Sequence, residues 1–252
     1  MTARAKLNRS VYVLQHEGAR RFVELSIHSL IEPIKSMRLR ASIAADAKQA
    51  ESRLRHGKYG RGLFVDCGSN IGQGYSYFSK YYRNEHFDYI LVEPNPRCLP
   101  FLEALRSDCR SHIEIIGKAA STKSGSAMLF GPPSKEGGPT DQALSIIAEH
   151  NSCLYDSEAA TTDAVETFSL SQLILEKRNS YDVIALKMDV EGAEYDVLQD
   201  FLETGAHRAL FAVYVEFHSR YMKPTQRLER RFAEQWIKCS LQKESVIVRE
   251  WI

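Results

Sequence analysis

Short apolar runs divide most of the chain into pieces of strand length. They cover residues 63–67, 89–92, 113–116, 183–188 and 210–215. Each run is long enough for one buried β-strand. Helix-forming segments follow these runs at residues 75–82, 99–107, 194–202 and 226–237. Strands that alternate with helices predict a doubly wound α/β fold, in which helices cover both faces of a largely parallel sheet.

Weaker signals fill the rest of this pattern. Residues 127–130 and 165–170 are each expected to form a short strand, residues 171–177 a helix, and residues 246–248 an edge strand. The polar stretch 131–163 begins with Gly131-Pro132-Pro133 and is the strongest loop signal in the chain. A long irregular segment inside an α/β domain is usually a lid, a binding loop or disordered, so we expect substrate recognition there.

Residues 1–58 are predicted to form a helical extension ahead of a domain that spans residues 59–252. Val11, Leu14 and Phe22 belong to a series of apolar residues at helical spacing. Pro33 is expected to break or kink this helix. A second helix is expected at residues 37–54, where the composition favours helix strongly.

Positive charge is concentrated in this N-terminal segment. The whole chain has a net charge of +1, but residues 1–62 contain 13 Lys/Arg and 5 Asp/Glu and therefore carry +8. A basic helical surface is suited to anionic lipid or to an acidic substrate. The alternative, which we prefer, is a solvated helical cap that packs on the following domain.

The cysteines and the hydropathy pattern predict a cytoplasmic protein. The five cysteines, an odd number, include no C-x-x-C pair, which favours reduced thiols over a disulfide framework or a zinc site. The basic N-terminus lacks the apolar core of a signal peptide. No apolar run approaches the roughly 20 residues of a membrane span, so membrane contact would be peripheral, through the N-terminal helices.

A glycine-rich turn follows the first strand, with the sequence DCGSNIGQG at residues 66–74. Strand, glycine turn and helix together form the nucleotide-binding opening of a doubly wound domain. Glycines let the backbone approach a ligand closely, and a helix N-terminus offers unpaired N–H groups. The turn residues in the predicted binding set are Gly68, Ser69, Asn70, Gly72 and Gln73.

The spacing in this turn differs from the G-x-G-x-x-G pattern that cradles a pyrophosphate. Asp66 closes the strand, and its carboxylate would repel phosphate. A carboxylate there suits a ligand with a cationic group, such as the amino group of S-adenosylmethionine (SAM). A turn that binds no ligand, or that binds another nucleotide, is the alternative.

The second strand also ends in an acidic residue. Glu93 precedes Pro94-Asn95-Pro96 and lies 27 positions after Asp66. At this place in a nucleotide-binding fold, an acidic residue accepts hydrogen bonds from ribose hydroxyls. Asn95 belongs to the same predicted site, and the small residues around Ala120 would leave room for an adenine ring.

Two later strands end in polar clusters. Asp189 and Glu191 follow the strand at 183–188, and Glu216 and His218 follow the strand at 210–215. Ligands bind beyond the carboxyl ends of the strands in sheets of this kind. We therefore expect Asp66, Glu93 and these two clusters to meet at one edge of the sheet.

Four sequence blocks in order resemble the FkbM family of SAM-dependent methyltransferases. They are DCGSNIGQG, VEPNP, LKMDVEGAEYDVL and VYVEFH, and the resemblance covers residues 60–220. It implies a class I methyltransferase fold with a mostly parallel, seven-stranded, Rossmann-like sheet. One departure is Ser171, which stands where the family often has an acidic residue.

The resemblance implies transfer of a methyl group to a hydroxyl oxygen of a carbohydrate, glycolipid, polysaccharide or natural product. Such an acceptor needs a group that removes its proton. The predicted catalytic residues are Asp189, Glu191, His218 and Lys187, and Asp189 is also expected to border the methyl donor. Asp189, Glu216 and His218 would suit Mg²⁺ or Mn²⁺, although nothing in their spacing requires a metal.

Other activities remain as alternatives at this stage. One is N-methylation, or O-methylation of a soluble small molecule, and another is a non-catalytic SAM-binding or scaffold domain. A nucleic-acid substrate is disfavoured, because the chain lacks an N-P-P-[YF] motif and its basic residues are not interleaved with aromatics near the predicted site.

Overall fold

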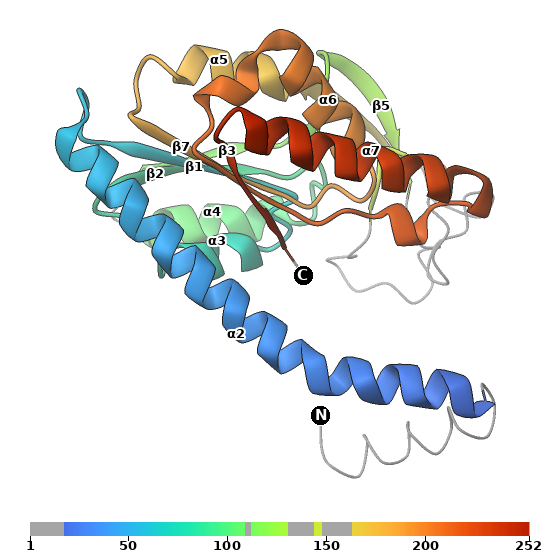
Figure 1. Ribbon diagram of the computed structural model, residues 1–252. Helices are drawn as coiled ribbons and strands as arrows, with labels where there is room; N and C mark the ends of the chain where they lie inside the picture. Colours follow the sequence, from blue (N-terminus) through green and yellow to red (C-terminus); the bar gives the residue numbers. More distant parts are fainter. Residues whose placement is uncertain (1–17, 109–111, 131–143, 148–162, 252) are drawn as a thin grey trace. The chain divides into compact units, whose positions relative to one another are not determined.

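The computed structural model in Figure 1 describes residues 18–108, 112–130, 144–147 and 163–251. The chain divides into two compact units, residues 1–45 and Asp46–Ile252. Most of the stretch 131–163, where we expect substrate recognition, lies outside the described residues. No helix in the described part of the chain is both long and apolar enough to cross a bilayer.

The N-terminal helical segment is one helix rather than two. Helix α2 (Gly18–His56) passes through Pro33, so the break expected there is wrong, while a kink at this residue stays a prediction. A proline removes one backbone hydrogen bond and bends a helix, but it need not end the helix. The strongly helix-favouring residues that follow continue it.

The central element of the second unit is a parallel sheet of six strands in the order β3-β2-β1-β7-β8-β9. The strands are β1 (Gly62–Cys67), β2 (Phe87–Val92), β3 (Ile113–Ile116), β7 (Val183–Met188), β8 (Ala212–Val215) and β9 (Ile247–Glu250). The connecting helices are α3 (Gln73–Phe78), α4 (Leu99–Asp108), α5 (Leu170–Lys177), α6 (Glu194–Thr204) and α7 (Pro224–Lys243). The 3₁₀-helices η1 (Ala206–Ala209) and η2 (Ser219–Tyr221) precede β8 and α7. The α/β, Rossmann-like fold expected from the sequence is confirmed.

The expected number of seven strands in this sheet is corrected to six within the described residues. A separate three-stranded sheet has the order β4-β6-β5. Its strands are β4 (Ala119–Ser121), β5 (Gly125–Leu129) and β6 (Asp163–Ser169). The strands expected at 127–130 and 165–170 therefore pair with each other, antiparallel, instead of joining the main sheet.

The two faces of the main sheet are packed differently, because alternate residues of a strand point to opposite faces. On one face, Leu63 and Val65 of β1 belong to an aliphatic core with residues of α5, α6 and α7. On the other face, Phe64 lies among the aromatic rings of Phe78, Tyr82, Tyr89 and Tyr214. Burial on both faces explains why these strands read as continuous apolar runs.

The strand order places a crevice between β1 and β7. From β1 the chain proceeds to β2 and β3 on one side, and it returns to β7, β8 and β9 on the other side. The carboxyl ends of two neighbouring strands diverge at such a switch point, and ligands bind there. This topology brings the glycine turn after β1 beside the acidic turn after β7.

A buried ion pair joins the two strands at this point. The Nζ atom of Lys187 on β7 lies 3.2 Å from Oδ1 of Asp66 on β1, and both side chains are almost fully buried. The same ammonium donates to the carbonyl of Gly68 at 2.8 Å and lies 3.5 Å from Oδ2 of Asp189. Burial lowers the pKa of Lys187, but Asp66 and Asp189 outweigh this effect and raise it to about 12. The lysine is therefore charged at neutral pH.

We predict that Lys187→Met lowers the free energy of unfolding by about 3–5 kcal/mol, because it leaves the Asp66 carboxylate buried without its cation. Urea unfolding would measure the loss. The double variant Lys187→Met/Asp66→Asn should recover much of it. The matched control is Lys177→Met, whose half-exposed pair with Glu114 should contribute at most about 1 kcal/mol. Equal losses in Lys187→Met and Lys177→Met would contradict the prediction.

Candidate active site

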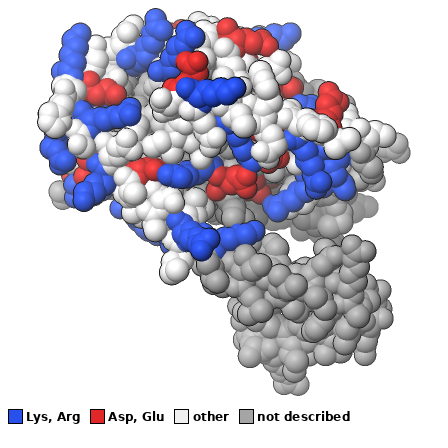
Figure 2. All heavy atoms as spheres, in the orientation of Figure 1, with Lys and Arg blue, Asp and Glu red and all other residues white. Residues whose placement is uncertain are grey.

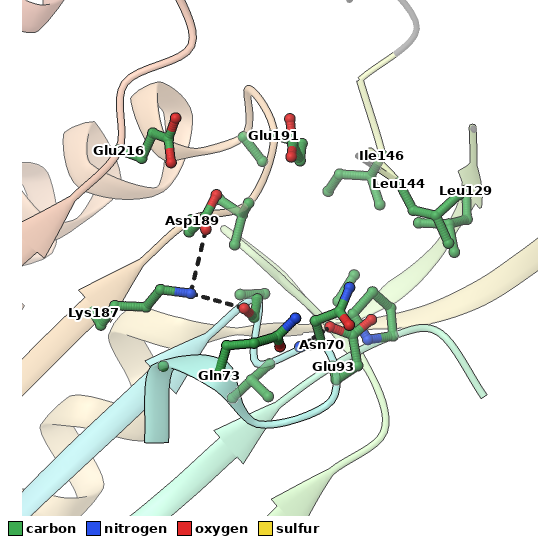
Figure 3. A pocket seen from close by; sticks show the side chains of 18 of the residues that line it. Asn70, Gln73, Glu93, Leu129, Leu144, Ile146, Lys187, Asp189, Glu191 and Glu216 are labelled. Atoms are coloured by element: carbon green, nitrogen blue, oxygen red, sulfur yellow. Dashed lines mark hydrogen bonds and ion pairs between the residues drawn. The ribbon is translucent and has the colours of Figure 1, made fainter. Parts of the chain in front are cut away.

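A cavity of about 400 Å³ lies at the carboxyl ends of β1, β2, β7 and β8. This volume is within the range of roughly 300–1,000 Å³ that is typical of small-molecule sites. Figure 3 shows the side chains around it, with Asp189, Glu191 and Glu216 on one side, Asn70, Gln73 and Glu93 on a second, and Leu129, Leu144 and Ile146 on a third. The cavity therefore has an acidic wall, a wall formed by the glycine turn with Glu93, and an apolar wall.

The glycine turn forms the floor of the cavity through backbone geometry. Gly68 has a φ of +76°, and a Cβ atom there would lie 1.8 Å from the carbonyl oxygen of Asp189. A side chain at this position would push the turns after β1 and β7 apart. Asn70 has a φ of +47°, and its side chain accepts a hydrogen bond from the N–H of Ile71 at 2.8 Å. Asparagine tolerates this left-handed conformation better than most residues.

Glu93 holds the glycine turn and lines the cavity. Its Oε2 accepts a hydrogen bond from the N–H of Asn70 at 2.8 Å, and its Oε1 accepts one from the N–H of Asn95 at 2.9 Å. Each carboxylate oxygen has two acceptor positions, so each retains one for a ligand hydroxyl. Burial raises the pKa of Glu93, and the two N–H groups oppose this shift.

Asp66 does not line the cavity. Its side chain is fully buried, and a Cβ atom on Gly74 would lie 2.4 Å from its Oδ2, so the carboxylate faces the start of α3. We expected Asp66 to contact a cationic ligand directly, and this placement changes that interpretation. The carboxylate instead pairs with Lys187, so it supports the floor of the cavity from behind.

Lys187 reaches the cavity, but its ammonium is already surrounded by oxygen atoms. Its neighbours are the carboxylates of Asp66 and Asp189 and the carbonyls of Cys67 and Gly68. A lysine with a pKa raised to about 12 is a poor proton carrier near neutral pH. Lys187 is therefore suited to fixing Asp189 and the glycine turn.

Three carboxylates surround one edge of the His218 ring. Nε2 of His218 lies 3.2 Å from Glu191, 3.7 Å from Asp189 and 4.0 Å from Glu216. The histidine is only 2% exposed and does not line the cavity, whereas all three carboxylates do. Burial lowers the pKa of His218, but Glu194, Glu191 and Asp189 raise it to about 9. The imidazolium therefore lies behind the acidic wall and offsets part of its negative charge.

Glu194 is a residue whose importance the sequence pattern did not reveal. Its Oε1 accepts a hydrogen bond from the N–H of His218 at 2.8 Å and lies 3.3 Å from Nδ1 of the same residue. Its Oε2 accepts one from the N–H of Gly192 at 2.8 Å. The fully buried carboxylate thus ties the turn after β7 to the turn after β8. Its place in the first turn of α6 suggested only a favourable interaction with the helix dipole.

The apolar wall comes largely from a short segment, residues 144–147, that sequence reasoning placed only within a general loop. Leu144 and Ile146 line the cavity beside Leu129. Ser145 donates a hydrogen bond from its hydroxyl to the carbonyl of Glu191 at 2.6 Å, and its backbone pairs with Phe130. The segment is therefore attached to the acidic turn, a contact between residues 46 positions apart that periodicity cannot predict.

The candidate metal ligands come together as expected. Atoms of Asp189, Glu216 and His218 that are able to bind a metal all lie within 4.8 Å of one another. Two carboxylates and an imidazole nitrogen would form a donor set suitable for Mg²⁺ or Mn²⁺ once the imidazolium of His218 has lost its proton. Arg220 and Lys187 already pair with Glu216 and Asp189, so the cluster has cations of its own and a metal stays a prediction.

The structure divides the predicted site residues into two groups. One group lines the cavity and consists of Gly68, Asn70, Gln73, Glu93, Ala120, Lys187, Asp189, Glu191 and Glu216. The other group lies behind the cavity walls and consists of Asp66, Ser69, Gly72, Asn95 and His218. Its members shape the turns: Ser69, for example, donates a hydrogen bond to the carbonyl of Asp66 at 2.7 Å. Trp251, after β9, also lines the cavity and was not expected there.

Comparison with known proteins agrees with the resemblance noted in the sequence. The model of the methyltransferase FkbM domain matches residues 66–235. One solved structure, a methyltransferase FkbM from Methylobacillus flagellatus KT, is 16% identical with a TM-score of 0.44, over 71% of this chain and 37% of that chain. This chain thus covers well under half of that protein, and no curated protein matches. Because the family match extends over more than half of its length, the chain belongs to the methyltransferase FkbM domain family.

Proposed function

We propose that this chain is a SAM-dependent O-methyltransferase that acts on a hydroxyl of a carbohydrate, a glycolipid or polysaccharide, or a natural product. The observation that carries the proposal is the cavity at the switch point of the sheet. It combines the glycine turn, a ribose-type acceptor at Glu93 and the acidic wall of Asp189, Glu191 and Glu216. The family assignment supports methyl transfer as the reaction.

The residues around the cavity fit SAM by their chemistry. Glu93 has free acceptor positions for ribose hydroxyls, and Ala119 and Ala120 leave space beside it for a flat ring. Gly68 allows the backbone to approach the ligand closely, because no side chain covers it. SAM supplies a methyl group on a positively charged sulfonium, and the carboxylates of the acidic wall are suited to that charge.

A carboxylate of the acidic wall is the proton acceptor that the geometry favours. A general base must reach the hydroxyl proton directly or through one water molecule. Asp189 and Glu216 line the cavity, whereas His218 lies behind them. Burial and the neighbouring charge of Asp189 raise the pKa of Glu216, which makes it a stronger base than an ordinary glutamate. His218, positioned by Glu194, orients these carboxylates.

We predict that Glu93→Ala weakens SAM binding at least about tenfold, because hydrogen bonds from the ribose to a charged acceptor are lost. Isothermal titration calorimetry would measure the dissociation constant, with thermal unfolding to check the fold. The control is Glu103→Ala, which removes an exposed carboxylate paired with Arg106 on α4. Failure of the unaltered protein to bind SAM would contradict the whole proposal.

We predict that Asp189→Asn lowers kcat at least about a hundredfold and changes SAM affinity much less, because the variant keeps the shape of the side chain but loses the base or orienting charge. Methyl transfer to a panel of glycans, glycolipids and small hydroxyl compounds would measure turnover. The control is Asp196→Asn on the exposed face of α6.

The same experiment separates the remaining alternatives. A non-catalytic SAM-binding domain would show no turnover even before substitution, and an N-methyltransferase would methylate only amine acceptors in the panel. Repeating the assay with EDTA, and then with added Mg²⁺ or Mn²⁺, tests the metal. Loss with EDTA and recovery with metal would assign a cation to Asp189, Glu216 and His218, and unchanged turnover would exclude it.

A further inference from the structure

Helix α7 exposes a continuous apolar stripe to solvent. Leu228, Phe232 and Trp236 are 65%, 69% and 53% exposed, respectively. They are four residues apart, so they lie on the same face of the helix. The other large exposed apolar side chains in the described part of the chain, Met37, Tyr59, Phe101 and Met128, lie singly on other elements or in loops.

The exposure is not a sign that the helix is loosely attached. The opposite face of α7 is anchored in the core by Ile237 and Leu241, which are 1% and 0% exposed. Arg230 on the same helix pairs with Asp196 of α6 at 3.1 Å. A firmly packed helix with three large apolar residues on its outer face presents a fixed surface, of the kind that marks an interaction site.

The charges that border the stripe are mostly positive. Lys223, Arg231 and Lys243 are exposed and form no ion pair within the described residues, and Glu229 is the exposed acid beside them. Figure 2 shows this side of the molecule, where Lys and Arg side chains and some Asp and Glu side chains lie among larger uncharged areas. Aromatic and aliphatic residues bordered by basic ones are typical of helices that lie in the interface of an anionic membrane.

The position of α7 relates the stripe to the cavity. The helix follows β8 through Glu216, His218 and η2, so it begins at the same edge of the sheet as the acidic wall. Leu228 is in its second turn, and Phe232 and Trp236 extend the stripe away from that edge. The N-terminal end of the stripe is therefore the end nearer to the acidic wall.

We propose that the exposed face of α7, formed by Leu228, Phe232 and Trp236 with their basic neighbours, docks on an anionic phospholipid bilayer. The three apolar side chains enter the headgroup boundary, and Lys223, Arg231 and Lys243 contact the phosphates. Docking of this kind does not depend on catalysis. If the proposed function holds, docking brings the chain to the surface that carries lipid-linked hydroxyl acceptors.

Co-sedimentation of the full-length chain with vesicles tests the proposal. We expect binding to vesicles of phosphatidylcholine with phosphatidylserine, weaker binding to phosphatidylcholine alone, and weakening by salt. Phe232→Ser/Trp236→Ser should reduce binding at least about tenfold, because it removes most of the apolar surface that enters the bilayer. Arg231→Glu should reduce binding to the anionic vesicles selectively.

Matched controls come from elsewhere on the second unit. Phe101→Ser removes an exposed aromatic residue from α4, which connects β2 to β3 at the opposite end of the sheet order, and Arg178→Glu reverses an exposed charge after α5. Both should bind as the unaltered chain does. Thermal unfolding and SAM titration confirm that each variant is folded, and they are independent of vesicle binding.

The possible results distinguish four situations. Selective loss of vesicle binding in the α7 variants supports the proposal. Unchanged binding in Phe232→Ser/Trp236→Ser would overturn it and assign binding to another surface, such as the basic N-terminal segment, which every variant retains. No binding by the unaltered chain would also overturn it. If light scattering shows a dimer that this double variant converts to a monomer, the stripe is an interface between two copies instead.

Discussion

The arrangement of the site depends on the ammonium group of Lys187, a residue of the central strand β7. This group interacts with oxygen atoms of the neighbouring strand β1, of the glycine turn and of the acidic turn. A buried charge is stable only with partners of this kind, so the lysine fixes the relative positions of the groups around it. The floor of the cavity and the start of its acidic wall are thereby held by one side chain.

Much of the fold could be predicted because the strands are buried on both faces and appear as short apolar runs. The acidic residues at the strand ends then predicted where the cavity lies, because the carboxyl ends of parallel strands meet at one edge of the sheet. The sequence could not show that 127–130 and 165–170 form a separate sheet, because pairing partners leave no periodic signal. The continuity of α2 was not predicted, for another reason. A proline lowers helix stability locally, but whether the helix continues depends on the helix propensity of the neighbouring residues.

The site was predicted less completely than the fold. Glu93, Asp189 and Glu216 line the cavity because strand ends point there by topology. Asp66 and His218 belong to the same strand ends but lie behind the cavity walls, because side-chain direction depends on packing that the sequence does not display. Glu194 and Ser145 form hydrogen bonds between turns that are far apart in the sequence. The residue types alone do not indicate these contacts.

The hydrogen bond from Ser145 to the carbonyl of Glu191 makes two functions of the site mutually dependent. Leu144 and Ile146 form the wall that apolar parts of a ligand would touch, and Glu191 belongs to the turn that carries the negative charge. The hydrogen bond is a physical link through which a ligand against the apolar wall could shift the acidic turn. If occupancy of one half of the cavity changes affinity in the other half, thermodynamic linkage makes the effect equal in both directions.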